Sequence, residues 1–345
     1  MFADPGWRGL APATSKVRHT AVDRPVPAGQ TQRIMDRGEA LTSAGLSERA
    51  KGHLAMLLFS ALVAGSFSLG SLAAPHIAPL AINALRFGLA GLLLGAIVLA
   101  SGQIKRAHFA APWRYLVLGG LFSIYFTLMF EGLKTAAPVA TSAVFTLTPI
   151  MAAGFGWLVM RQVTTQRMAV ALSIAGAGAL WVIFDAEVTA ILALRIERGE
   201  LIFFVGCIAH ALYAPLVPKL RRSEPVLVMT FGTLAAGFLI LGSLGAPALW
   251  HTDWAGLPGI VWITVLYVAI FASAVTFFLV QYAAVRLPSA KVMAYTYLTP
   301  AWVILWEGAL GNGWPPVAVL AGVGLVIAGL LLLLKDDSQV KGSSA

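Results

Sequence analysis

Ten mostly apolar stretches, each of about 20 residues, occupy nearly all of this 345-residue chain between residues 53 and 334. In a hydrocarbon environment the backbone N–H and C=O groups have no water to bind, so such stretches form membrane-spanning helices. Apolar residues make up 59% of the chain and charged residues only 11%, less than half the charge of an ordinary globular domain. The sequence therefore predicts an all-α, polytopic membrane protein of ten transmembrane helices. The predicted spans are 54–72, 78–100, 113–133, 138–160, 168–184, 200–216, 226–244, 259–283, 289–310 and 316–334.

Most of the 24 lysines and arginines fall in every second connection or in the two tails. Positive residues are retained on the cytoplasmic side of a membrane, so this alternation predicts an even number of helices and two cytoplasmic termini. We expect a multi-pass protein of the cell (inner) membrane. The connections that carry these residues hold Lys105 and Arg106, then Arg161 and Arg167, then Lys219, Arg221 and Arg222, and finally Arg286.

The net charge of +9 is explained by this orientation signal together with a basic tail near an anionic lipid surface, so we expect no nucleic-acid partner. The single cysteine, Cys207, excludes an internal disulfide and offers no metal cluster. Neither a Walker A pattern nor a nucleotide-binding domain is present, so we expect no ATP-driven step and no cofactor.

The chain divides into four segments. Residues 1–52 are rich in Pro, Gly, Ala, Arg and Ser and are expected to form a flexible cytoplasmic tail. Residues 53–184 and 200–334 hold five predicted helices each, and the acidic linker 185–199 between them is expected to act as an external hinge. Residues 335–345 form the predicted cytoplasmic C-terminal tail.

An internal repeat relates the two halves. Thr148-Pro149 and Thr299-Pro300 each follow a leucine in mid-helix, 151 positions apart, and the same offset relates Gly178 to Gly329. Because five helices is an odd number, the second copy must enter the membrane from the opposite side. The two halves are then an inverted repeat, an arrangement typical of secondary transporters. A mid-span proline removes one helical hydrogen bond. A single one indicates a simple kink, whereas a matched pair favours two broken helices around a central site.

Several short motifs follow one another in the order found in one transporter family. They are Gly65-Ser66-Phe67 in the first span, Pro79 with Arg86-Phe87 in the second, Leu133-Lys134, Ser142-Ala143 and Pro149 around the fourth, and Gly199-Glu200-Leu201 with His210-Ala211-Leu212-Tyr213 in the sixth. In these motifs the chain resembles the EamA-type branch of the drug/metabolite transporter superfamily, whose members have two tandem five-helix repeats. The resemblance implies export of amino acids or related metabolites.

The chain departs from the family pattern at three places. Ala64 replaces the tryptophan that precedes the first-span motif. Met160-Arg161 and Gly311-Asn312 replace the Gly-Glu that closes the fourth and ninth helices. A gating role for that glutamate is therefore not carried over.

Only a few ionisable groups lie well inside the predicted spans, where each is costly unless it is paired or hydrated. Arg86 and Glu307 both fall in the outer half of the bilayer, where they are expected to be close enough to pair. They form either a substrate or proton site or a buried structural ion pair. The predicted substrate-binding residues are Arg86, Thr148, Pro149, Tyr297, Pro300 and Glu307.

His210, in the middle of the sixth span, and Glu307 are candidates for proton coupling. The alternative for His210 is a neutral histidine that bonds to a neighbouring carbonyl. Aromatic residues of the ninth span around Pro300, namely Tyr295, Tyr297, Trp302 and Trp306, are expected to form a wall against an organic substrate, where a cation–π contact could hold an amine. Interfacial anchoring and helix packing explain such residues equally well.

These features predict a secondary carrier, not an enzyme, that moves a small organic solute across the membrane by alternating access. A proton gradient is the expected driving force, and the protein is expected to act as a monomer or homodimer in the lipid bilayer. Two alternatives are an intramembrane lipid-modifying enzyme and a non-transporting membrane sensor or scaffold. An enzyme of that kind would need clustered acids or a His/Asp/Glu group, whereas this chain has scattered single residues.

Overall fold

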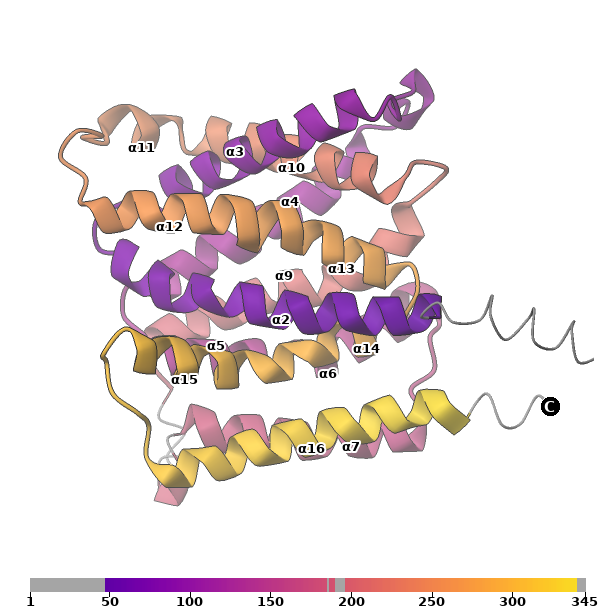
Figure 1. The fold of residues 1–345 in the computed structure, drawn as a ribbon, viewed down its shortest axis with the longest axis vertical. Coiled ribbons are helices and arrows are strands. Elements are labelled where there is room, and N and C mark those ends of the chain that lie inside the picture. Colours follow the sequence, from indigo (N-terminus) through magenta and orange to yellow (C-terminus); the bar gives the residue numbers. More distant parts are fainter. Residues whose placement is uncertain (1–46, 185, 190–195, 340–345) are drawn as a thin grey trace, which may run out of the picture. The chain divides into compact units, whose positions relative to one another are not determined.

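The computed structural model describes residues 47–184, 186–189 and 196–339, and the regular structure of these residues is helical throughout, without a strand (Figure 1). Eight of its helical runs are long and apolar enough to cross a membrane. They are α2 (Glu48–Ala73), α3 (Pro79–Ala100), α4 (Trp113–Gly132), the run Pro138–Met160, α7 (Gln166–Ile183), α9 (Arg198–Leu220), α10 (Val226–Leu244) and the run Gly259–Ala284. The protein is therefore a multi-pass membrane protein, and the tail before residue 47 lies outside the described residues.

The last two predicted spans are helical but are not among these eight long apolar runs. The ninth is a chain of three short helices, and the apolar part of the tenth, Val317–Leu333, is a shorter apolar helix. These elements are α14 (Ser289–Ala294), η3 (Tyr295–Leu298), α15 (Thr299–Ala309) and α16 (Val317–Gln339). Two small helices, η1 (Arg106–Phe109) and α11 (Ala246–His251), lie in the connections.

Local sequence signals explain where several helices begin. Pro79 and Pro138 occupy the first turn of α3 and of α5, where the missing N–H of proline costs nothing. The α2 helix begins at Glu48 instead of the predicted residue 54, because the hydroxyl of Ser47 accepts a hydrogen bond from the N–H of Ala50 at 3.2 Å. Such a cap satisfies one of the free N–H groups of the first turn.

Three spans are interrupted near their middle. The fourth divides into α5 (Pro138–Phe145) and α6 (Thr148–Met160), and the ninth divides before α15. Pro149 and Pro300 lie in the first turn of α6 and of α15. The eighth span consists of α12 (Gly259–Ala269), a π-helix η2 (Ile270–Val275) and α13 (Thr276–Ala284). The two proline-marked interruptions agree with the broken helices expected from the sequence; the π-helix has no such marker.

Helices of the first half pack mainly against helices of the second half, and these contacts come in related pairs. The α3 helix packs on α10 at one edge of the bundle and α7 packs on α16 at the opposite edge (Figure 1). Between these edges, α4 contacts α9 while α2 contacts α12 and α13, and α6 contacts α9 while α15 contacts α2. If each helix in one of these contacts is replaced by the equivalent helix of the other half, the result is another of these contacts: α4 with α9 corresponds to α13 with α2, and α6 with α9 corresponds to α15 with α2.

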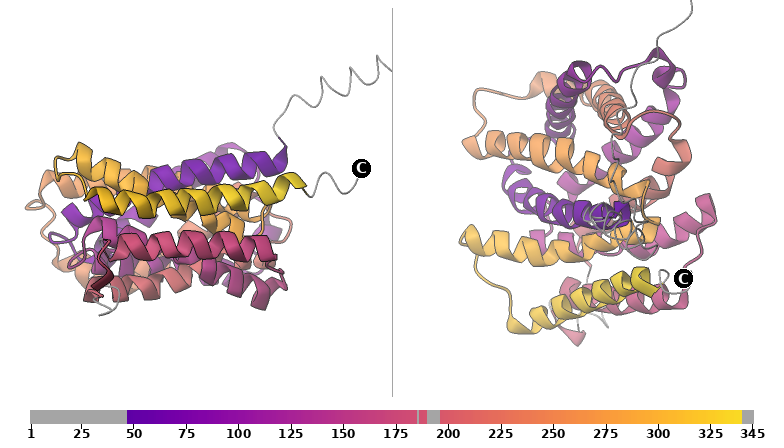
Figure 2. Two further views of the ribbon diagram at one scale, coloured as in Figure 1. Left: turned by 90° about the horizontal axis from the view of Figure 1, so that it is seen from below. Right: turned by 45° about the vertical axis from the view of Figure 1, so that its right-hand side comes forward.

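Glycines allow α7 and α16 to lie side by side at close range (Figure 2). A Cβ atom added at Gly178 would lie 2.6 Å from the carbonyl oxygen of Gly322, and one at Gly329 would lie 2.7 Å from the carbonyl oxygen of Ala171. Small residues of this kind let helix backbones approach each other inside a membrane.

We expect Gly178→Ala to force α7 and α16 apart and to destabilise the protein by about 1–3 kcal/mol, the usual cost of overpacking. The matched control is Gly324→Ala on α16, where an added Cβ meets no atom within 4 Å. Because Cys207 is the one cysteine and is buried, its reaction with a thiol-reactive dye on heating reports unfolding. Equal unfolding temperatures for the two variants would contradict the close packing of these helices.

Candidate substrate-binding site

Arg86 lies on α3 and its side chain is fully buried. It projects from α3 toward the π-helix, where its Nε donates a hydrogen bond to Ser273 Oγ and its Nη2 donates to the carbonyl oxygen of Ala272. The guanidinium carbon lies 3.5 Å from the centre of the Phe126 ring, a cation–π arrangement. The buried guanidinium of Arg86 therefore contacts neutral groups of α4 and η2.

The π-helix explains why a carbonyl is available to Arg86. A π-helix widens the turn and disturbs the regular i→i−4 hydrogen bonds, and such bulges occur often at functional sites. Within a membrane a freed carbonyl needs a donor from the protein, and Arg86 supplies one for Ala272. Arg86 and the irregular turn Ile270–Val275 thus stabilise each other.

A buried cluster of aromatic rings lies next to Arg86, whose guanidinium contacts the Phe126 ring. His210 lies within the cluster, with ring centres 4.5 Å from Tyr125, 5.0 Å from Phe145 and 5.7 Å from Phe122. Its Nδ1 atom is buried and has no hydrogen-bond partner, so the bond to a carbonyl that we considered as an alternative is not found at this nitrogen. The aromatic cluster, as we call it below, comprises Phe67, Phe87, Phe122, Tyr125, Phe126, Phe145, Phe203, His210, Tyr213 and Phe277.

The two broken helices meet beside the aromatic cluster. The carbonyl of Phe145, at the end of α5, accepts hydrogen bonds from Thr148 Oγ1 at 2.5 Å and from Thr296 Oγ1 at 3.5 Å. Threonine hydroxyls can satisfy carbonyl groups that a helix break sets free. Thr148 and Pro149 are therefore placed at the junction of α5 with α6, and this junction touches the η3 turn of the ninth span.

Two other predicted site residues bond to groups other than Arg86. Tyr297 is buried, but its hydroxyl donates to the carbonyl of Leu172 on α7 at 3.3 Å. Glu307 accepts a hydrogen bond from Asn312 Nδ2 at 2.7 Å near the end of α15. The expected Arg86–Glu307 ion pair is not formed in this structure, because each side chain bonds to a partner close to its own position in the bundle.

Sequence reasoning missed a polar network that joins three helices. Gln281 on α13 donates to Tyr213 Oη at 2.7 Å and to Thr233 Oγ1 at 3.2 Å, and it accepts from Thr230 Oγ1 at 3.2 Å. All four side chains are buried. Gln281 is a polar amide within a long apolar run, and this contrast could have predicted a buried hydrogen-bond network at that position. Ser273 gave no comparable signal, because its role depends on the π-helix.

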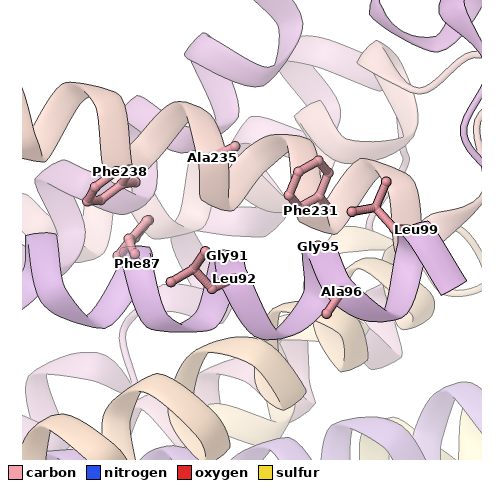
Figure 3. A pocket seen from close by; sticks show the side chains of 10 residues that line it. Phe87, Gly91, Leu92, Gly95, Ala96, Leu99, Phe231, Ala235 and Phe238 are labelled. Atoms are coloured by element: carbon pink, nitrogen blue, oxygen red, sulfur yellow. The ribbon is translucent and has the colours of Figure 1, made fainter.

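A large cavity of about 620 Å³ lies between α3 and α10 (Figure 3). Its ten lining residues are all apolar, and they include Gly88, which lies against the Phe238 ring, and Gly95, which lies against the Phe231 ring. Leu92 and Leu99 on its rim are exposed. The cavity contains none of the predicted site residues, and its chemistry suits an acyl chain better than a polar solute.

A model of the EamA-like transporter family matches residues 50–184 and again residues 197–335. The chain belongs to the EamA-like transporter family. It is 26% identical over 284 residues to the uncharacterized transporter YyaM of Bacillus subtilis (strain 168), a match that covers 81% of this chain and 92% of that protein. A crystal structure of a protein 18% identical in sequence shares the fold, with a TM-score of 0.66 over 85% of this chain and 98% of that one.

Family membership gives meaning to the motif in the first span of this EamA-like transporter. Gly65 lies against Tyr267 of α12 and leaves no room for a side chain, while the Tyr267 hydroxyl donates to the carbonyl of Leu62 at 2.8 Å. Phe67 joins the aromatic cluster, 5.8 Å from Phe145 between ring centres. The motif therefore brings α2 against the eighth span and supplies one wall of the cluster.

A second buried arginine closes one end of the transporter bundle. Arg114 Nη1 lies 2.5 Å from Glu224, which belongs to the connection between α9 and α10, and both side chains are buried. Burial by itself raises the pKa of Glu224. Hydrogen bonds from the N–H groups of Glu224 and Arg222 and from Arg114 outweigh burial and hold the pKa below its ordinary value. The pair joins a helix of the first half to a connection of the second.

We expect Glu224→Gln to destabilise the transporter by about 3–5 kcal/mol near neutral pH, because it leaves Arg114 buried without a counter-charge. The lowered pKa of Glu224 means that its stabilisation is present above the pKa of the unfolded state and is lost as the pH falls through the folded-state pKa. The difference in unfolding temperature between wild type and variant should therefore shrink in acid. The control is Glu131→Gln, which removes an exposed pair with Lys134 worth at most about 1 kcal/mol. A difference that stays constant down to strongly acidic pH would contradict this assignment.

Proposed function

We propose that the protein is a secondary carrier that exports small organic solutes, such as amino acids or related metabolites, across the cell (inner) membrane. In this proposal ten helices form two inverted repeats, residues 53–184 and 200–334, with both termini in the cytoplasm. Rocking of one group of helices against the other would expose a central site to each side in turn.

The observation that carries the proposal is a set of reciprocal contacts across the offset of 151 residues. Gly178 packs on Gly322 and Val326, and their counterparts at this offset, Gly329 with Ala171 and Ala175, pack on each other in the same way. In a two-fold arrangement, if residue i of one copy contacts residue j of the other, then j of the first contacts i of the second. This relation supports a pseudo-two-fold axis between α7 and α16.

A contact at the helix breaks supports the same axis near the centre of the bundle. Phe145 and Thr296 are 151 positions apart, and the Thr296 hydroxyl lies 3.5 Å from the Phe145 carbonyl. A residue that touches its own counterpart must lie close to the axis. Broken helices that meet on such an axis are the usual setting of substrate sites in secondary transporters.

The proposed substrate site extends from this junction to Arg86 and comprises Arg86, Thr148, Pro149, Tyr297, Pro300 and Glu307. Arg86 and the rings of the aromatic cluster are buried in the present structure, so access of a solute to Arg86 requires the helices around it to move. His210 and Glu307 are the proposed groups for proton coupling, because an ionisable residue inside a membrane is costly and such residues mark proton relays in pumps and transporters.

Purified protein in liposomes tests the proposal by counterflow of labelled amino acids and analogues. We expect Arg86→Ala and Glu307→Gln each to lower the rate at least about tenfold, since a hydrogen bond to a charged group contributes about 1.5–3 kcal/mol. Glu131→Gln is the control with a wild-type rate, because this residue pairs with Lys134 at the surface. Wild-type rates in both site variants would remove these residues from the site. Lipid turnover without solute movement would contradict a carrier.

A further inference from the structure

Among the residues that the structure describes, no carboxylate forms an ion pair with Arg86. Ion pairs are found elsewhere, where Lys51 and Arg286 pair with Glu48, Arg114 with Glu224 and Lys134 with Glu131. The two hydrogen bonds of Arg86 go to a neutral hydroxyl and a backbone carbonyl, and its buried Nη1 has no partner. A buried cation in this condition is costly, and a counter-charge of good geometry relieves the cost.

Further unused polar atoms lie in the same cluster. The Tyr125 hydroxyl and His210 Nδ1 are both buried without a hydrogen-bond partner. Continuous ring contacts connect them to Arg86: the guanidinium lies on Phe126, Phe126 is 4.5 Å from Tyr125 between ring centres, and Tyr125 is 4.5 Å from His210. A guanidinium N–H and a phenol O–H are donors, so this part of the cluster complements an acceptor that carries negative charge.

An amine would find less support at this position. Glu200 accepts from the N–H of Glu197 at the start of α9. Glu307 accepts from Asn312 through Oε2 near the end of α15, while its buried Oε1 has no partner and makes no ion pair with Arg86. The remaining buried acid, Glu224, is engaged by Arg114. The free acceptor close to Arg86 in sequence is Asn83 Oδ1, a neutral amide oxygen. A cationic solute beside Arg86 would therefore face a positive charge that no carboxylate in contact with the guanidinium offsets.

We propose that Arg86 Nη1 and the Tyr125 hydroxyl bind the carboxylate of the solute, whose apolar or aromatic body lies against the rings of the cluster. The substrate class is then small organic carboxylates with an apolar body, and amines of the same shape are rejected. This inference rests on the proposed function, because it assigns the solute of the same central site.

Three probes with one body and different charge test the inference on purified full-length protein. They are 3-phenylpropionate, 3-phenylpropanamide and 2-phenylethylamine, and binding is measured as the rise in unfolding temperature with probe concentration. We expect the carboxylate to bind at least about tenfold more tightly than the amide or the amine, the usual contribution of a charge-assisted hydrogen bond. Equal binding of the amine, or binding of none of the three, would overturn the inference.

Variants locate the binding to Arg86. Arg86→Met should reduce the affinity for 3-phenylpropionate to that for the amide, and Tyr125→Phe, which keeps the fold of the cluster, should weaken the carboxylate several-fold. Lys134→Met is the matched control, since it removes a positive charge at the surface and should leave binding unchanged. Unchanged carboxylate affinity in folded Arg86→Met, or in Tyr125→Phe if the first variant does not fold, would contradict the assignment.

Counterflow of the same probes separates this inference from the proposed function. Preference for the carboxylate in binding, with no solute movement in liposomes, would support the inference and contradict the carrier. Transport of the amine in preference to the carboxylate would support the carrier and contradict the inference.

Discussion

Each backbone N–H and C=O group inside a membrane must find a partner within the protein, and this constraint governs where the helices can be irregular. The breaks in the fourth and ninth spans and the π-helix in the eighth each present buried residues to the interior, among them Thr148, Thr296 and Ser273. At two of them a polar side chain reaches a carbonyl: Thr148 and Thr296 at Phe145 in the fourth span, and Arg86 at Ala272 in the eighth. Irregular backbone and polar side chains therefore occur together, in the region where we place the substrate.

The sequence predicted the proline-marked irregularities and missed the other. Pro149 and Pro300 remove a helical donor wherever they occur, so the breaks follow from residue chemistry alone. The π-helix Ile270–Val275 contains no proline or glycine, and its stability depends on Arg86 from a distant helix. Arg86 is buried inside the bundle, as expected, but its expected ion pair with Glu307 is not formed. Helix packing determines that Arg86 bonds to Ser273 and Ala272 instead, and a single sequence does not encode that packing locally.

The aromatic residues show a similar limit. The rings of the ninth span were expected to line the site, yet Trp302 donates to Ser60 on α2 and Tyr297 to Leu172 on α7. The buried cluster instead draws its rings chiefly from α4 and α9, which contact each other across the two halves. Helical spans this apolar give little indication of which face is buried. Short-range signals such as caps and prolines were therefore readable, whereas the composition of the central cluster needed the three-dimensional structure.

The central claim is that the two halves are inverted copies, so that equivalent connections face opposite sides of the membrane. The most direct measurement is the labelling of single cysteines in intact cells by a membrane-impermeant maleimide, in protein whose Cys207 has been replaced by serine. Ser101→Cys follows α3 and Ala255→Cys lies in the equivalent connection after α10, and both positions are exposed. The account predicts that Ala255→Cys is labelled from outside and Ser101→Cys only after the cells are opened. Labelling of both from the same side would contradict the inverted repeat and the alternating-access carrier built on it.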